Sequence, residues 1–192
     1  MSNPLPVNLQ GMWDWAYDWT QRSDCAYDQS YRNYQIRPSD GKYCFDCSSF
    51  TFFALWLGGG LDVGYLGYNN NLADYQAGRA NAWNVTMMIN SLTRYAGWET
   101  YSPQSETWQF GDILAKTRTH TEIFYAPQTY TMGAKNSASG ITITDYSRQY
   151  YDVLLRWPGS TPGPTPPPGP TLPLPIWLLK RAIENQKGGI LM

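Results

Sequence analysis

The residue best suited to covalent chemistry is Cys47, which follows Asp46 and opens the apolar segment CSSFTFFALWL, residues 47–57. If Asp46 caps a helix there, the thiol lies in the first helical turn. Unpaired N–H groups and the positive end of the helix dipole then stabilise a thiolate, the form of cysteine that attacks acyl carbons. Cys47 is therefore our candidate nucleophile. The competing interpretation is a small buried hydrophobe, as free cysteines often are.

The candidate base is His120, because the chain contains one histidine and any cysteine–histidine chemistry must use it. His120 stands at the start of a predicted strand, and a strand beginning near Asp112 precedes it. A cysteine at the start of a helix that faces a histidine on the adjacent sheet is the papain-like arrangement. A structural histidine at a strand end is the alternative.

A third group should orient the imidazole, and the sequence offers two candidates. If residues 126–129 form a hairpin turn, His120 falls opposite Lys135, which cannot accept a hydrogen bond from the ring. A shift of one residue brings Asn136 there, and its carboxamide can accept that bond and fix the tautomer. We therefore predict Asn136 as the third catalytic residue, with a turn residue as the alternative. Glu122 is the rival, because it projects from the same strand face as His120, but we assign it to the substrate side.

The elements that must position these residues follow from apolar spacing. Helical spacing predicts helices over 9–24, 47–57 and 82–95, and residues 26–43 are predicted to be irregular. Short strands are predicted at 112–115, 121–125, 129–134 and 140–144. Helices followed by antiparallel strands predict an α+β fold.

The domain organisation is set by a proline-rich segment at residues 158–175, which we interpret as an extended linker outside any packed core. It separates a globular body, residues 1–157, from a short tail, residues 176–192, whose pattern over 176–184 is that of two or three helical turns. Seventeen residues are too few for an independent domain. The tail is either a docking peptide, whose partner the sequence does not identify, or the start of something lost.

The overall composition excludes several classes of function. The 192-residue chain is 42% hydrophobic and 15% charged, with a formal net charge of −1. It therefore has material for a core and no sign of binding nucleic acid or anionic membranes. No apolar run approaches the roughly 20 residues of a membrane span. The N-terminus has no signal-peptide pattern. We expect a product made in the host cytoplasm, which something else must release if it acts outside the cell.

Three motifs occur in an order that resembles a known family. Asp46-Cys47-Ser48-Ser49-Phe50, then Gly111-Asp112-Ile113-Leu114, then His120-Thr121-Glu122-Ile123 look like the NlpC-type papain-like amidohydrolases, to which CHAP domains are related. The closest resemblance is to the hydrolase domains of bacteriophage lysins, and it covers roughly residues 10–150. One residue departs from the pattern: Thr119 stands where the family usually has glycine.

The resemblance implies both a fold and an activity. The fold is α+β and papain-like, with N-terminal helices packed on a small antiparallel sheet. The activity is cleavage of an amide bond in bacterial peptidoglycan, as an N-acetylmuramoyl-L-alanine amidase or a stem-peptide endopeptidase, with no metal or cofactor. The protein would act on the bacterial cell wall as a released lysin or a virion component. Asp46 and Ser48, beside the nucleophile, would bind the stem peptide, although Asp46 also suits the role of helix cap.

Three other interpretations remain open at this point. Cys44 and Cys47 have the C-x-x-C spacing of a redox site, which normally needs a preceding strand and a βαβ context. With Cys25 and His120 they provide a possible Cys₃His zinc site. Aromatic residues make up 16% of the chain, and they suit a non-catalytic wall-binding module.

Overall fold

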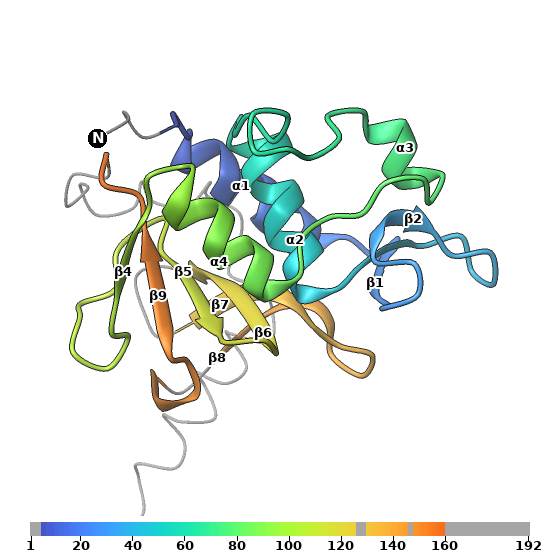
Figure 1. The fold of residues 1–192 in the computed structure, drawn as a ribbon. Coiled ribbons are helices and arrows are strands. Elements are labelled where there is room, and N and C mark those ends of the chain that lie inside the picture. The colour runs from blue at the N-terminus through green and yellow to red at the C-terminus, as the bar shows by residue number, and fades with distance from the viewer. Residues whose placement is uncertain (1–4, 126–129, 146–147, 160–192) are drawn as a thin grey trace, which may run out of the picture.

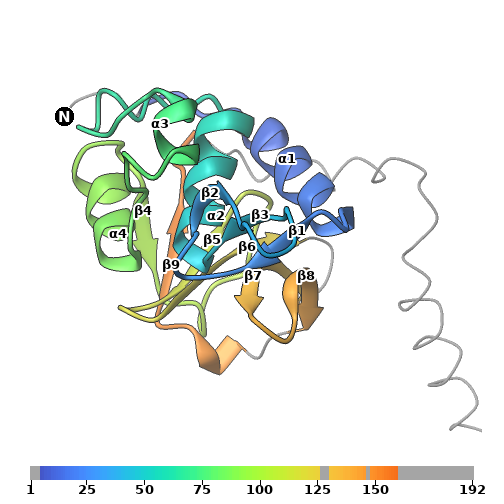
Figure 2. The ribbon, with the colours of Figure 1, turned by 90° about the vertical axis from the view of Figure 1, so that its right-hand side faces the viewer.

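The computed structural model describes residues 5–125, 130–145 and 148–159. Within them, helices pack on a six-stranded antiparallel sheet, and a smaller three-stranded sheet lies beside the same helices (Figures 1 and 2). The α+β class is as predicted, with the N-terminal helices on one face of the larger sheet.

The first predicted helix is α1, Leu9–Gln21, which begins at the N-cap Asn8. Of the five residues at helical spacing that predicted it, Met12, Trp13, Ala16 and Trp19 are buried and Leu9 is half-buried. Gly11 of α1 and Gly58 lie in close backbone contact. A Cβ atom on Gly58 would come within 2.5 Å of the Gly11 carbonyl oxygen. Glycine at both positions therefore lets α1 cross the segment that carries the nucleophile.

The second predicted helix begins at the nucleophile. It is α2, Cys47–Phe53, and it continues as the π-helical turn η1, Ala54–Gly58. The predicted helix over 82–95 is α4, Val85–Arg94, capped by Asn84. A short helix that was not predicted, α3, spans Leu72–Gln76.

The larger sheet has the strand order β4-β9-β5-β6-β7-β8. The four predicted strands are β5, Ile113–Lys116, β6, His120–Tyr125, β7, Tyr130–Asn136, and β8, Gly140–Asp145. The predicted hairpin register is confirmed, since Ile123 pairs with Met132 and Tyr125 with Tyr130. The sheet also contains β4, Glu99–Tyr101, and β9, Val153–Arg156, after the 3₁₀ turn η2, Arg148–Tyr150. Strands as short as β4 and β9 show too few alternations to be predicted from the sequence.

The segment predicted to be irregular, residues 26–43, contains most of the smaller sheet, so that prediction is wrong. Its strands are β1, Cys25–Tyr27, β2, Asn33–Ile36, and β3, Tyr43–Phe45. β3 lies between the other two. The register of β2 shifts between Asn33 and Gln35, where Tyr34 takes a positive φ of 64°. This irregularity breaks the alternation that would have indicated a strand.

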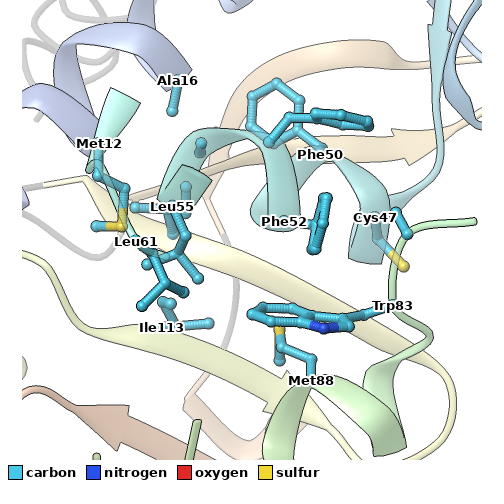
Figure 3. Close-up of a cluster of buried hydrophobic side chains, with 14 of the residues drawn as sticks. Met12, Ala16, Cys47, Phe50, Phe52, Leu55, Leu61, Trp83, Met88 and Ile113 are labelled. Atoms are coloured by element: carbon cyan, nitrogen blue, oxygen red, sulfur yellow. The ribbon is translucent and has the colours of Figure 1, made fainter. Parts of the chain in front are cut away.

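Side chains of the larger sheet pack on both of its faces. The main core lies between the sheet and the helices; Figure 3 shows part of it, with Phe52 and Trp83 beside Cys47. A second cluster on the sheet consists of Trp108, Leu114, Phe124, Tyr151 and Leu154. Successive residues of β6 alternate between the faces, with Ile123 in the main core and Phe124 in the second cluster. His120 and Glu122 therefore share the face of Phe124.

The two ends of the described body are joined, because the indole N–H of Trp157 donates to the carbonyl of Leu5 at 3.1 Å. Most of the predicted linker and the entire tail lie outside the described residues. Among the helices that are described, none has the length and apolar character needed to cross a membrane.

Candidate active site

The start of α2 is fixed by Asp46, as predicted. The carboxylate of Asp46 accepts a hydrogen bond from the backbone N–H of Ser49 at 2.7 Å, and the Ser49 hydroxyl accepts one from the Asp46 backbone N–H at 2.9 Å. This reciprocal pair is a capping box. It places Cys47 at the first position of the helix.

Asp46 and Ser48 belong to an internal polar network. Arg32 lies with its Nε 3.1 Å from an Asp46 carboxylate oxygen and donates to the Ser48 hydroxyl at 3.1 Å. The Ser48 hydroxyl donates to the backbone carbonyl of Trp83 at 2.8 Å. Both Asp46 and Ser48 are buried. Their polar atoms hold the start of α2 to the segment before α4, and Arg32 is the partly exposed member of the group. Binding of a stem peptide by Asp46 and Ser48 stays a prediction.

The thiol of Cys47 meets the start of β6. Its sulfur lies 3.8 Å from the backbone carbonyl oxygen of Thr119, the residue immediately before His120. The turn into β6 is made by Arg118, which has a positive φ of 67°. Because Arg118 takes the left-handed conformation, Thr119 does not need it. This explains how threonine can stand immediately before His120, where the resemblance leads one to expect glycine. Residues 72 positions apart are therefore neighbours, with the cysteine at the start of α2 beside the strand that begins at His120.

The imidazole of His120 is held by Glu122. The Nε2 atom of His120 lies 2.5 Å from the Oε1 atom of Glu122, and both side chains are buried. The two residues are two positions apart on β6, so they project from the same face of the strand. Glu122 is therefore the group that orients the imidazole, not a substrate-side carboxylate.

The other carboxylate oxygen of Glu122 is surrounded by donors. Tyr151 donates its hydroxyl to Oε2 at 2.8 Å, the Thr131 hydroxyl donates to the same atom, and the Lys135 ammonium forms an ion pair with it. Burial alone would raise the pKa of Glu122, but the hydrogen bond from His120 and the charge of Lys135 outweigh it and lower that pKa. Glu122 is thus ionised at neutral pH.

The predicted role of Asn136 is corrected by its hydrogen bonds. Its carboxamide oxygen accepts from the backbone N–H groups of Ala138 and Ser139 at 2.9 and 2.8 Å. These bonds close the turn between β7 and β8. Asn136 is therefore a turn residue, and the position beside the imidazole that it was predicted to fill belongs to Glu122.

The protonation state of Cys47 differs from the preformed thiolate that its helix position suggested. Burial, followed by the nearby Asp46 carboxylate, raises the pKa of Cys47 to about 12. The backbone N–H groups of Thr121 and Ser48 act in the opposite direction but do not overcome burial. At neutral pH the thiol is therefore protonated, and its reaction requires a base.

One tyrosine contacts the proposed base. The exposed ring of Tyr150 meets the His120 imidazole edge to face, with centroids 6.0 Å apart. Burial raises the pKa of Tyr150, and the charges of Glu122 and Cys47 add to that effect. Burial likewise raises the pKa of Tyr27 on β1, with a smaller contribution from the charges of Cys47 and Asp46. The contact of Tyr150 brings part of η2 to the site.

The two alternative uses of the cysteines are not supported by their placement. All three cysteines are free thiols. Cys44 lies on β3 with its sulfur 3.5 Å from the carbonyl of Lys42, whereas the Cys47 sulfur meets Thr119. The strand at this spacing, β3, carries Cys44 itself, and it belongs to the small sheet and not to a βαβ unit. In the described part of the chain, no group of three or more His, Cys, Asp or Glu side chains is arranged to hold a metal ion.

Three site residues were not identified from the sequence. Arg32 and Tyr151 come from segments with no motif, and no sequence signal marks them. For Lys135 the sequence does give a signal, because the hairpin register places it opposite His120. A lysine cannot accept a hydrogen bond from the imidazole, but it can pair with a neighbouring carboxylate, here that of Glu122.

Comparisons with known proteins find a structural likeness at low sequence identity. No family model matches the sequence, and no curated protein matches it. Among solved structures, the chain is similar to the crystal structure of the NlpC/p60 domain of peptidoglycan hydrolase SagA, with a TM-score of 0.45 and 18% sequence identity. The match covers 79% of this chain and 100% of that one. Nothing about the chemistry of this chain follows from a likeness at this level.

Proposed function

We propose that this chain is a cysteine-dependent peptidoglycan hydrolase with Cys47 as nucleophile, His120 as base and Glu122 as the residue that orients the base. One observation carries the proposal. The start of α2 presents the Cys47 thiol to the start of β6, where His120 is held 2.5 Å from a buried carboxylate. Nucleophile, base and orienting group in that order make up the activated-nucleophile arrangement.

The mechanism follows from the protonation states. Because burial keeps the Cys47 thiol protonated, the resting enzyme carries a thiol rather than a preformed thiolate. His120 removes the thiol proton as the sulfur attacks the amide carbonyl carbon, and Glu122 stabilises the imidazolium that forms. The imidazolium then protonates the leaving amine, and the amide C–N bond breaks to leave a thioester. Water, activated by His120, hydrolyses the thioester and frees the thiol.

The developing oxyanion needs donors close to Cys47. The first N–H groups of an α-helix have no acceptor within the helix. Those at the start of α2, with Cys47 itself as the first residue, are the ones we assign to the oxyanion. The capping box fixes their direction, so Asp46 contributes to catalysis through the position of the helix.

The substrate class is supported by the three ordered motifs around Asp46, Asp112 and His120. These favour an amide bond of bacterial peptidoglycan, cut either between muramic acid and L-alanine or within the stem peptide. We further propose that the protein acts on the wall as a phage-type lysin or a virion component, with peptidoglycan as its partner. The need for an outside release step is part of the same proposal.

Digestion of purified cell walls followed by mass spectrometry of the soluble muropeptides tests this proposal. New amine termini or free lactyl groups are expected with the wild type, and none with Cys47→Ala. Cys25→Ala is the matched control, because Cys25 lies on β1 and should leave cleavage intact. Wall binding without any cleavage product would show that the protein is a binding module and not a hydrolase. If a chelator abolishes the activity and zinc restores it, the mechanism is metal-dependent and the cysteine mechanism is wrong.

A further inference from the structure

Lys135 is a buried cation next to the proposed active site, and the mechanism above does not use it. It lies on β7 with its side chain 1% exposed. Its ammonium pairs with Glu122 and donates to the Thr131 hydroxyl at 2.9 Å and to the Thr131 carbonyl at 3.3 Å. A buried lysine is costly unless it is paired, so its location calls for an explanation.

The backbone of β7 makes room for this pair. The β6–β7 register, in which Ile123 faces Met132, places Gly133 opposite Glu122. A Cβ atom on Gly133 would come within 3.1 Å of the Glu122 Cγ atom. The absence of a side chain there lets Glu122 lie across β7, where its Oε2 atom meets residues on both sides of Gly133. Its Oε1 atom remains directed to His120.

The charge on Glu122 decides which way its bond to the imidazole runs. As a carboxylate it can only accept, so His120 must carry its proton on Nε2 and Nδ1 is the basic nitrogen. A protonated Glu122 could instead donate to Nε2, and the neutral ring would then carry its proton on Nδ1. That tautomer has no basic nitrogen to offer to the Cys47 thiol. The direction of one hydrogen bond therefore determines whether His120 can act as a base.

Of the groups around Glu122, Lys135 is the one that supplies a full positive charge from another strand. The titratable groups that face Glu122 are His120 on its own strand, Lys135 on β7, and Tyr151 after η2, while Tyr150 and the Cys47 thiol lie farther out. The charge of Lys135 is among the causes that lower the pKa of Glu122 against its burial. Burial in turn lowers the pKa of Lys135 to about 8.

We propose that Lys135 is a positioning residue: by pairing with Glu122 it keeps that carboxylate ionised and holds His120 in the tautomer with its proton on Nε2. The assignment of Nδ1 as the base for Cys47 rests on the proposed function. The dependence of the tautomer on Lys135 does not. Lys135 touches no substrate in this account and acts only through Glu122.

Because the chain has one histidine, its imidazole ¹⁵N resonances report His120 without ambiguity. We would record them in the full-length wild type and in Lys135→Met and Lys135→Gln while lowering the pH until the His120–Glu122 pair takes up one further proton. In the wild type that proton should go to the imidazole, which keeps its proton on Nε2 while Glu122 stays a carboxylate. In both variants, which lack the charge of Lys135, most of it should go to Glu122, which then donates to Nε2 and leaves the ring proton on Nδ1; Lys135→Gln keeps a hydrogen-bond donor and separates the effect of charge from that of the donor. At that pH the kcat for wall cleavage should fall about 10²- to 10⁴-fold relative to the wild type, the usual contribution of a general base, with a smaller change in KM.

Lys116→Met is the matched control. Lys116 lies opposite His120 in the register of β5 with β6, but its side chain is 43% exposed and its ammonium lies 3.9 Å from the Asp152 carboxylate. It should leave the tautomer and kcat unchanged. If one Lys135 variant does not fold, the other still decides the outcome, and retention of the Nε2 proton in a folded Lys135 variant overturns the proposal. A wild type that cleaves no peptidoglycan but shows the Lys135-dependent tautomer would refute the proposed function and leave this inference standing.

Discussion

The Nε2 atom of His120 lies 2.5 Å from the Oε1 atom of Glu122, two residues farther along the same strand. The base and the residue that orients it therefore share one element. No hairpin turn or loop has to be placed correctly for the imidazole to be held. The nucleophile comes from a different element, α2, so it can be altered by mutation without touching the strand that holds the base.

Replacement of the nucleophile should abolish cleavage and leave the fold intact. We expect Cys47→Ala to lower turnover by at least about 10³-fold, because no other group can form the acyl intermediate. Cleavage assays on purified walls measure this, with circular dichroism to confirm folding. Cys25→Ala, on the partly exposed strand β1, should retain most activity. Near-normal turnover in Cys47→Ala would remove the cysteine mechanism.

Removing the charge of Glu122 should destabilise the protein, because it leaves Lys135 buried without its counter-ion. We expect Glu122→Gln to lower the free energy of unfolding by about 3–5 kcal/mol, as for other broken buried pairs. Urea denaturation measures this. The double variant Glu122→Gln with Lys135→Met should regain most of the loss but no activity. If the double variant is no more stable than Glu122→Gln, the ion pair is not the cause.

The same pair predicts the acid sensitivity of the fold. The pKa of Glu122 is lowered in the folded state from its ordinary value of 4.5. Its contribution to stability is therefore complete above pH 4.5 and is lost as the pH falls through the folded-state value. Unfolding free energies measured from pH 7 downward should drop more steeply for the wild type than for the Glu122→Gln/Lys135→Met double variant. Parallel curves would contradict the lowered pKa.

The reactivity of Cys47 should reflect its buried, protonated thiol. With a pKa raised to about 12, we expect alkylation by iodoacetamide to be slow at pH 7 and to keep rising with pH beyond 9, where an ordinary thiol levels off. Mass spectrometry of the modified peptide separates Cys47 from the other two cysteines. His120→Ala should nearly abolish cleavage, since no other imidazole exists. A plateau in Cys47 alkylation near pH 7 would indicate a preformed thiolate instead.

Loss of the α2 cap should be more costly than loss of the α1 cap. Asp46 is buried and pairs with Arg32 as well as capping α2, whereas Asn8 is an exposed cap of α1. We expect Asp46→Ala to cost about 3 kcal/mol, of which the cap is ~1–2, and Asn8→Ala to cost about 1 kcal/mol. Thermal and urea unfolding would show the difference. Equal costs would mean that Arg32 is satisfied without Asp46.

The packing of Glu122 over β7 gives a test with no change of charge. In Gly133→Ala the new methyl group would lie 3.1 Å from the Glu122 Cγ atom, so the carboxylate must shift relative to His120. We expect a stability loss of about 1–3 kcal/mol. The fall in kcat should exceed what the folded fraction explains. Activity that simply tracks the folded fraction would show that the position of Glu122 over Gly133 has no catalytic role.

The sequence by itself determined the elements that carry the candidate nucleophile and base. Asp46 before an apolar run predicted the helix that begins at Cys47, because a cap and a helical pattern are local properties. The start of β6 at His120 and the register with β7 were also predicted, since a hairpin register depends on the turn and the alternation of its strands. The irregular strands of the small sheet and the short edge strand β4 were missed, because they have too few residues for a periodic signal.

Only the tertiary structure decided what Glu122, Asn136, Asp46 and Ser48 do. Each choice depends on which polar partner lies within about 3 Å, and a residue-level register cannot resolve that distance. Asn136 lies one residue past the position opposite His120 and closes a turn instead. Lys135 pairs with Glu122 because Gly133 leaves room between them. Burial on a sheet face shared by β6 and β7 fixes this charge pairing, and burial is a property of the assembled fold rather than of any one segment.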